Sequence, residues 1–148
     1  MALLFYFSSQ PYHQQDLRPN LHRILPEQFI IDHFSGVELH YSGEIISIKH
    51  SGVDGFVEFF IRKAAHLSIY GLLGMLMYRA LRKTPKARSQ ILWFALIICF
   101  LYAGTDEMHQ YLTGERTPLF ADVLLDTFGA SLGMLVCRKI MTDPKLIQ

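Results

Sequence analysis

Three short stretches of this sequence gather side chains that can bind ions or transfer protons. The first stretch, TDEMHQ, contains Asp106, Glu107, His109 and Gln110. In a helix, Asp106, His109 and Gln110 share one face, and Glu107 lies about 100° around the axis from Asp106. Because carboxylates and imidazoles can exchange protons, Glu107, His109 and Asp106 are candidates for general acid–base catalysis.

The other two stretches place polar residues four apart, as Asp122 and Asp126, and as His66 and Tyr70. Each pair would share one helix face. Nearby cationic residues are Arg62, Lys63 and Arg116. Such cations can hold a phosphate, arginine through a bidentate contact, while the acids orient hydroxyls or amines.

The spacing of these residues gives only a weak indication of a metal site. Asp106 and His109 form an Asp-x-x-His pair, similar to the Glu-x-x-His pairs of di-metal helical bundles. However, two histidines one helical turn apart, as in HExxH, are absent, and nearby Arg and Lys would repel a cation. We expect no metal and no cofactor, with a metal-assisted enzyme as an alternative.

The composition indicates a membrane protein. Hydrophobic residues make up 51% of the 148 residues, and the formal net charge is +1, so no basic field indicates nucleic-acid binding. The two cysteines, Cys99 and Cys137, each lie in an apolar run without a CxxC pair. We interpret them as packing residues.

The hydrophobic runs predict an all-α integral membrane helical bundle, formed by residues 1–148 as a single domain. Three full transmembrane helices are expected at 64–81, 91–112 and 119–138, the first continuing a helix that begins at an N-cap, Asp54. MALLFYF at the chain start is too short to cross a bilayer, which needs about 20 residues. It is either a short buried helix end or part of a longer first transmembrane helix, and the predicted fold includes it as a partial N-terminal helix.

The segment 8–53 is polar and rich in proline, so we expect mostly loop outside the cytoplasm. Within it, Pro26–Phe34 has the pattern of a short helix. VELHYSGEIISI alternates around Ser42 and Gly43, which predicts a short β-hairpin with a two-residue turn.

Positive charges predict the orientation of the spans. RKTPKARS, residues 82–89, and the last residues, with Arg138, Lys139 and Lys145, should be cytoplasmic, as should both termini of this multi-pass protein. Counting about 1.5 Å per residue from Ile91 places Asp106 roughly 22 Å across the bilayer. The polar residues of all three helices would then meet in one layer of the outer leaflet.

A charged side chain inside a membrane costs about 2.5–3.5 kcal/mol on insertion scales, so such residues tend to mark functional sites. The alternative is that the polar groups hold the helices together, with GASLG allowing close backbone approach. Tyr70 and Gln110 fit this structural role best.

Three segments together resemble the VanZ-like family, small bacterial membrane proteins named after a teicoplanin resistance protein: FYFSSQP, RKAAHLSIYGLLG and YAGTDEMHQYLTGERTPLFADVLLDTFGASLG. The family's characteristic positions fall on Lys63, His66, Tyr70, Asp106, Glu107, His109, Gln110, Arg116, Asp122, Asp126 and Gly129. Some members have asparagine at the position of Asp126. The resemblance implies a cell-envelope role linked to glycopeptide susceptibility and supplies no mechanism.

Four hypotheses follow. The first is a protein that binds or modifies a lipid-linked envelope component at the outer-leaflet polar layer, with a membrane lipid or lipid-linked precursor as its partner and no nucleic acid. The second is an intramembrane enzyme, either acid–base or metal-assisted. Ion or proton transport would need an oligomer, because charges confined to one leaflet make no path across the membrane. The fourth is a structural or regulatory membrane protein. The sequence leaves the oligomeric state open.

Overall fold

The computed structural model describes residues 16–85, 87–112 and 119–142 of the chain. The described residues divide into two compact units, whose boundary falls between Ala64 and Ala65. Residues 16–64 are called the N-terminal unit below, and residues 65–142 the helical unit. The expected partial first helix and the TGERTP loop with Arg116 lie outside the described residues.

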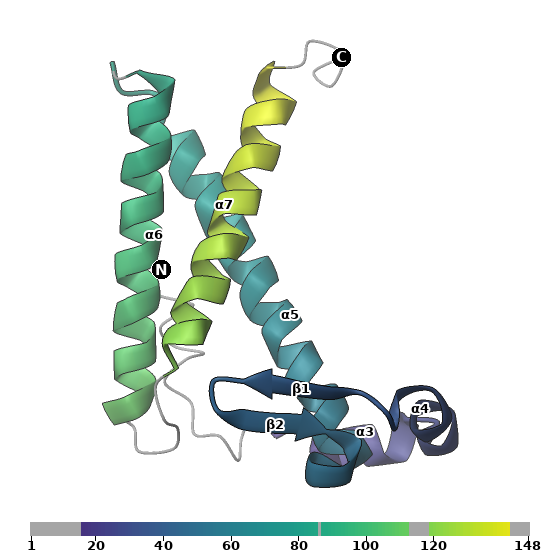
Figure 1. Cartoon of the computed structure of the whole chain (residues 1–148). Coiled ribbons are helices and arrows are strands. Elements are labelled where there is room, and N and C mark those ends of the chain that lie inside the picture. Colours follow the sequence, from purple (N-terminus) through teal and green to yellow (C-terminus); the bar gives the residue numbers. More distant parts are fainter. Residues whose placement is uncertain (1–15, 86, 113–118, 143–148) are drawn as a thin grey trace. The chain divides into compact units, whose positions relative to one another are not determined.

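The N-terminal unit combines short helices with a β-hairpin (Figure 1). In chain order its elements are α3 (Arg18–Ile24), α4 (Glu27–Phe34), β1 (Glu38–Tyr41), β2 (Glu44–Ser47) and the first part of α5 (Ile48–Leu81). The strands are antiparallel, with Tyr41 opposite Glu44. Ser42 and Gly43 at the turn both have positive φ, 53° and 92°, as a type I′ turn requires. The predicted hairpin is confirmed.

Helix α4 agrees with the helix predicted at Pro26–Phe34, whereas α3 lies in a segment predicted as loop. None of the seven residues of α3 is buried, so no apolar period in the sequence marks it. Pro19 lies in its first turn, where a missing N–H costs nothing. Just before the helix, hydrogen bonds from Arg18 hold the pKa of Asp16 below its usual range.

Helix α5 begins at Ile48, earlier than the predicted start at Asp54. Gly52 is non-helical, with φ 71° and ψ 171°, so the helix is kinked there and continues beyond it. Glycine reaches this left-handed φ without steric cost, which allows the chain to change direction. The sequence therefore located the main part of the helix but not the turn that precedes the kink.

The helical unit consists of residues 65–81 of α5 together with α6 (Arg88–Leu112) and α7 (Phe120–Thr142) (Figure 1). On α6 the buried seam repeats every four residues: Ile91, Ala95, Cys99 and Ala103. It packs with α7 residues such as Ala130, Met134 and Cys137. Both cysteines are buried and unbonded, as their apolar surroundings predicted.

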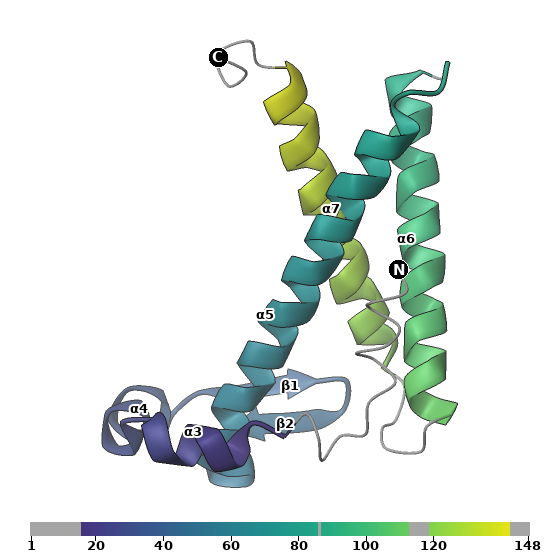
Figure 2. The ribbon, with the colours of Figure 1, turned by 180° about the vertical axis from the view of Figure 1, so that it is seen from behind.

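Glycines allow α5 and α7 to cross at close range, as Figures 1 and 2 show. A Cβ atom added at Gly133 would overlap the carbonyl oxygen of Gly71, and one added at Gly74 would overlap backbone atoms of Ala130. A Cβ at Gly129 would lie 2.6 Å from the Leu67 carbonyl oxygen. The predicted close backbone approach at GASLG is therefore present, with α5 as the partner helix.

Two helices of the described residues are long and apolar enough to cross a membrane, Ser89–Leu112 and Phe120–Met141. Only 33% and 39% of their most apolar windows are buried inside the protein. Their outward faces carry large apolar side chains, including Trp93, Leu101, Phe128 and Leu135. A core helix of a soluble protein would bury such residues, whereas lipid accommodates them.

The third predicted span, 64–81, belongs to α5 and is not among these two helices. His66, Tyr70 and Arg79 make this segment less apolar than α6 and α7. That it crosses the membrane stays a prediction.

Candidate functional site

Polar side chains are buried where the C-terminal part of α6 meets the N-terminal part of α7. The exposed fractions are 5% for Asp106, 6% for Glu107, 8% for Gln110 and 1% for Asp126. Tyr70 of α5 is 2% exposed. We call these five residues, together with His66, the polar cluster.

At the end of α6 the polar side chains are buried and the apolar side chains are exposed, which is the reverse of the pattern in a helix of a soluble protein. Asp106, Glu107 and Gln110 are buried, while their neighbours Met108 and Tyr111 are 58% and 55% exposed. In water this arrangement would expose apolar surface and desolvate charge at once. In a lipid bilayer the same arrangement is favourable, because the apolar side chains contact lipid and the polar side chains lie inside the protein. The buried acids still need partners there.

Glu107 joins α6 to the start of α7. Its Oε2 accepts a hydrogen bond of 3.2 Å from the backbone N–H of Leu119, the residue before α7. The first N–H groups of a helix have no partner within the helix, and the helix dipole favours a negative charge there. Glu107 therefore has a structural role in addition to the acid–base role predicted for it.

His66 of α5 and Asp126 of α7 form the polar contact between these two helices. His66 Nδ1 lies 3.5 Å from Asp126 Oδ1, an ion-pair distance when the imidazole is protonated. The His66 side chain is 31% exposed, whereas Asp126 is almost fully buried. Neither carboxylate oxygen of Asp126 has a hydrogen-bond partner within the described structure.

Tyr70 and Asp106 add two further buried polar atoms to the polar cluster. The Tyr70 hydroxyl and Asp106 Oδ1 also lack hydrogen-bond partners in the part of the chain described. The Tyr70 hydroxyl faces Asp106 without meeting hydrogen-bond geometry and interacts electrostatically with Asp126, and Tyr70 packs beside Tyr102 with ring centroids 6.2 Å apart. The polar cluster thus combines two carboxylates and a phenol whose hydrogen-bonding capacity is not filled.

The other predicted site residues have different positions. His109 and Asp122 are half-buried on α6 and α7, and both have interaction partners, as does the buried Gln110. Lys63, predicted to bind a phosphate, belongs to the N-terminal unit, where its Nζ lies 4.5 Å from the ring centroid of Tyr41 and 5.3 Å from that of Phe59. Arg116 lies outside the described residues.

Two features of the N-terminal unit were not predicted. Glu58 is 3% exposed and lies 3.5 Å from Arg18 and 3.9 Å from Arg62, its i+4 neighbour. Separately, His22 Nδ1 lies 2.9 Å from Glu27 Oε1 and 3.1 Å from Asp54 Oδ2. The i, i+4 spacing of Glu58 and Arg62 was readable in the sequence. The contact between α3 and α5 depends on tertiary structure alone.

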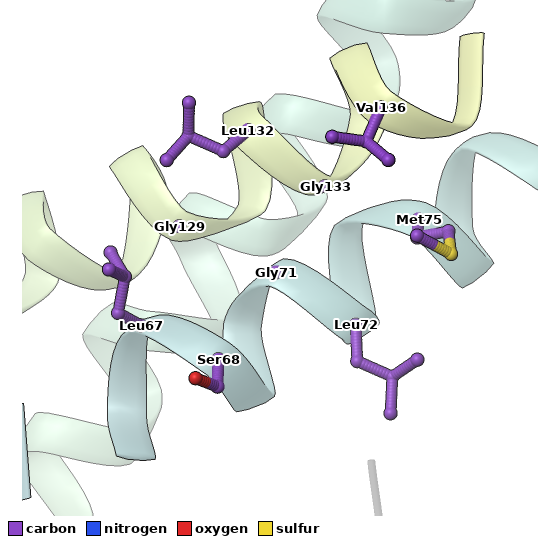
Figure 3. Close-up of a pocket in the computed structure, with 9 residues that line it drawn as sticks. All are labelled: Leu67, Ser68, Gly71, Leu72, Met75, Gly129, Leu132, Gly133 and Val136. Carbon is purple, nitrogen blue, oxygen red and sulfur yellow. The ribbon is translucent and has the colours of Figure 1, made fainter. Parts of the chain in front are cut away.

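An apolar groove lies beside the α5–α7 crossing (Figure 3). Its volume is about 380 Å³, and its lining residues are Leu67, Ser68, Gly71, Leu72, Met75, Gly129, Leu132, Gly133 and Val136. Gly129 follows Asp126 by three residues, and Leu67 follows His66 directly. The groove therefore begins within one helical turn of the polar cluster on both helices.

Comparison with known proteins places this arrangement in a family. The model of the family described as VanZ/LLP1 matches residues 1–142 and so covers both units. The chain belongs to the VanZ/LLP1 family. No curated protein and no solved structure matches it. Family membership confirms the resemblance drawn from the sequence motifs and, with the two apolar helices, indicates a VanZ-like membrane protein of the cell envelope.

Proposed function

We propose that this VanZ/LLP1 protein binds the head group of a lipid-linked envelope component at the polar cluster and thereby alters susceptibility to teicoplanin. The observation that carries the proposal is the burial of Asp106 and Asp126 with unfilled hydrogen-bonding capacity. A buried acceptor without a donor costs about 1–3 kcal/mol, and more when it is charged. Groups that only joined helices would be paired with one another, whereas a binding site keeps capacity for its ligand.

The location of the ligand follows from the expected topology. If the loop at residues 82–87 is cytoplasmic, the opposite end of α6, with Asp106 and Glu107, lies toward the outer leaflet. A lipid-linked envelope component displayed on the outer face can reach this layer by lateral diffusion. The apolar groove beside the α5–α7 crossing would accommodate part of its hydrocarbon chain.

Growth in the presence of teicoplanin tests this function. Cells would express the wild type, Asp126→Asn, Arg116→Ala or the control Glu44→Gln, an exposed acid at the hairpin turn, at matched membrane levels. We expect Asp126→Asn and Arg116→Ala to lose the effect of the wild type and Glu44→Gln to keep it. Wild-type resistance in both the Asp126→Asn and the Arg116→Ala cells would disprove the proposal.

A second candidate function is acid–base catalysis at the same layer. It is favoured by the contact between Asp126 and His66 Nδ1, because a carboxylate beside one imidazole nitrogen orients the ring and leaves the other nitrogen for proton transfer. Mass spectrometry of envelope precursors separates the two functions. A precursor species that changes with the wild type and not with His66→Gln would identify an enzyme, whereas unchanged precursors would identify a binder.

A further inference from the structure

The unfilled atoms of the polar cluster are almost all hydrogen-bond acceptors. They are Oδ1 of Asp106 and both carboxylate oxygens of Asp126, with the Tyr70 hydroxyl beside them. Within the described helical unit, His66 Nδ1 lies 3.5 Å from one oxygen of Asp126, and the Tyr70 hydroxyl, a single donor, interacts with both Asp106 and Asp126. The carboxylate oxygens outnumber the donors among these atoms, so a ligand that brings donors would complete them.

The balance of charges around His66 also favours a ligand that brings hydrogen-bond donors and positive charge. Asp106, Asp122 and Asp126 all interact electrostatically with His66, so one imidazole faces three acids. Protonation of a carboxyl group would not satisfy Asp126, because the new hydroxyl would need an acceptor and the other oxygen would still need a donor. A phosphate, which brings negative charge and acceptors only, would add to the imbalance at these residues.

A metal ion is a weaker match to these residues than an organic cation. Metal ligands must converge on one point, with bonds of about 2.0–2.6 Å. Among the described residues, the group whose ligand atoms lie within 4.8 Å of one another is His22, Glu27 and Asp54 of the N-terminal unit, not the acids of the polar cluster. A structural metal ion takes four or more ligands, whereas an ammonium has three N–H donors, so a pair of carboxylates suits the ammonium better.

On the basis of the proposed function, we propose that Asp106 and Asp126 bind a protonated primary amine carried by the head group of a lipid. A primary ammonium has three N–H donors and one positive charge, which matches acceptors contributed by two helices. The alkyl chains of the same lipid would lie along the groove that starts at Gly129, one turn from Asp126. The amine can belong to a phospholipid or to a lipid-linked precursor.

Lipid retention by the purified full-length protein tests this inference. The protein in detergent would be mixed with phosphatidylethanolamine, phosphatidylcholine or phosphatidylglycerol of identical acyl chains, and bound lipid counted by native mass spectrometry. Phosphatidylcholine keeps the charge but has no N–H donors, and phosphatidylglycerol lacks the cation. A second set would compare a lipid-linked muropeptide whose side-chain amine is free with the same molecule acetylated on that amine.

We expect the free-amine member of at least one set to be retained about tenfold better than its amine-blocked counterpart. Asp126→Asn and Asp106→Asn should remove this preference, and Glu44→Gln should preserve it. Which set shows the preference identifies the source of the amine. The comparison of lipids on the wild type keeps the test informative even if a variant fails to fold.

The other outcomes overturn the inference in distinguishable ways. Equal retention of free and blocked amines, or preference for phosphatidylglycerol, would reject the amine and leave binding of a lipid head group intact. No retention of any probe beyond that of an unrelated membrane protein would reject both the amine and the proposed function.

Discussion

At the scale of single residues, the most informative feature of this protein is that the end of α6 buries its polar side chains and exposes its apolar ones. A charged side chain enters a hydrocarbon layer at a cost of a few kcal/mol unless it is paired. Glu107 offsets this cost by accepting a hydrogen bond from the Leu119 N–H, whereas the Asp126 carboxylate lies at ion-pair distance from His66 Nδ1 and has no hydrogen bond among the described residues. The acids of this layer therefore differ in their contacts: Glu107 joins two helices, whereas Asp126 keeps the unfilled oxygens on which the proposed ligand binding depends.

The role of Glu107 as a cap for α7 leads to a stability prediction. Glu107→Ala removes the acceptor of the Leu119 N–H, so we expect the free energy of unfolding to fall by about 1–2 kcal/mol. Glu107→Gln keeps an amide oxygen and should lose clearly less. Thermal unfolding in detergent, followed by circular dichroism, measures both against Glu44→Ala, an exposed acid expected to have little effect. Equal losses for alanine and glutamine would show that the charge matters, not the hydrogen bond.

The sequence predicted most polar-cluster residues because helical spacing determines which side chains share a face. It did not predict how acids and cations pair, because pairing depends on tertiary contacts that spacing does not specify. Lys63 illustrates the difference, since it was predicted to bind phosphate and its ammonium lies over the rings of Tyr41 and Phe59. A cation beside aromatic rings gains about 0.5–2 kcal/mol without any anion.

At the scale of helices and strands, the arrangement of the helical unit depends on small residues. Between α5 and α7 the glycines allow backbone to approach backbone, and on α6 Ala95, Cys99 and Ala103 form a narrow seam. In a membrane, helices associate through such packing because lipid removes the hydrophobic driving force. The hydroxyls of Thr105, Thr127 and Ser131 donate to carbonyls of their own helices, which satisfies them without a partner helix.

A pair of glycine substitutions tests the helix crossing. Gly133→Ala would bring a methyl group onto the carbonyl oxygen of Gly71, so the helices must separate, and we expect a loss of about 1–3 kcal/mol in unfolding free energy. Gly104→Ala on α6 is the matched control, since its new methyl group has no neighbour within 4 Å and alanine favours helix by up to about 1 kcal/mol. Thermal unfolding of both variants in the same detergent provides the measurement. A Gly133→Ala protein as stable as Gly104→Ala would contradict the close crossing.

Element prediction succeeded where a strong periodic or turn signal exists. The hairpin followed from Ser42–Gly43 between alternating residues, and α6 and α7 followed from long apolar runs. It failed for α3, which buries none of its residues, and for the start of α5, where the kink at Gly52 interrupts the helix. Both failures concern exposed segments whose conformation is determined by contacts and single glycines, not by an apolar face.

At the scale of the whole molecule, the family assignment and the exposed apolar faces of α6 and α7 indicate a membrane protein, and the charge distribution predicts its orientation. Lys and Arg concentrate in residues 82–89 and after Cys137, which predicts that both segments are cytoplasmic. The hairpin should then be on the outer side, and α5, which connects the hairpin to residues 82–89, should cross the membrane. The function proposed for the polar cluster depends on this topology, because the ligand is expected in the outer leaflet.

Cysteine accessibility tests this topology together with the third span. Single cysteines would replace Glu44 in the hairpin turn, Lys83 after α5 and Lys139 near the end of α7, all exposed positions, and intact cells would be treated with a membrane-impermeant maleimide. The native Cys99 and Cys137 are 0% and 4% exposed, so the wild type serves as the unlabelled control.

We expect labelling of Glu44→Cys in intact cells, and of Lys83→Cys and Lys139→Cys only after permeabilisation. Lys83→Cys and Lys139→Cys are expected to share a side, because α6 and α7 are each expected to cross the membrane once. If Glu44→Cys and Lys83→Cys were labelled from the same side, α5 would not span the membrane. If Lys83→Cys and Lys139→Cys were labelled in intact cells and Glu44→Cys were not, the orientation would be inverted and the polar cluster would face the inner leaflet.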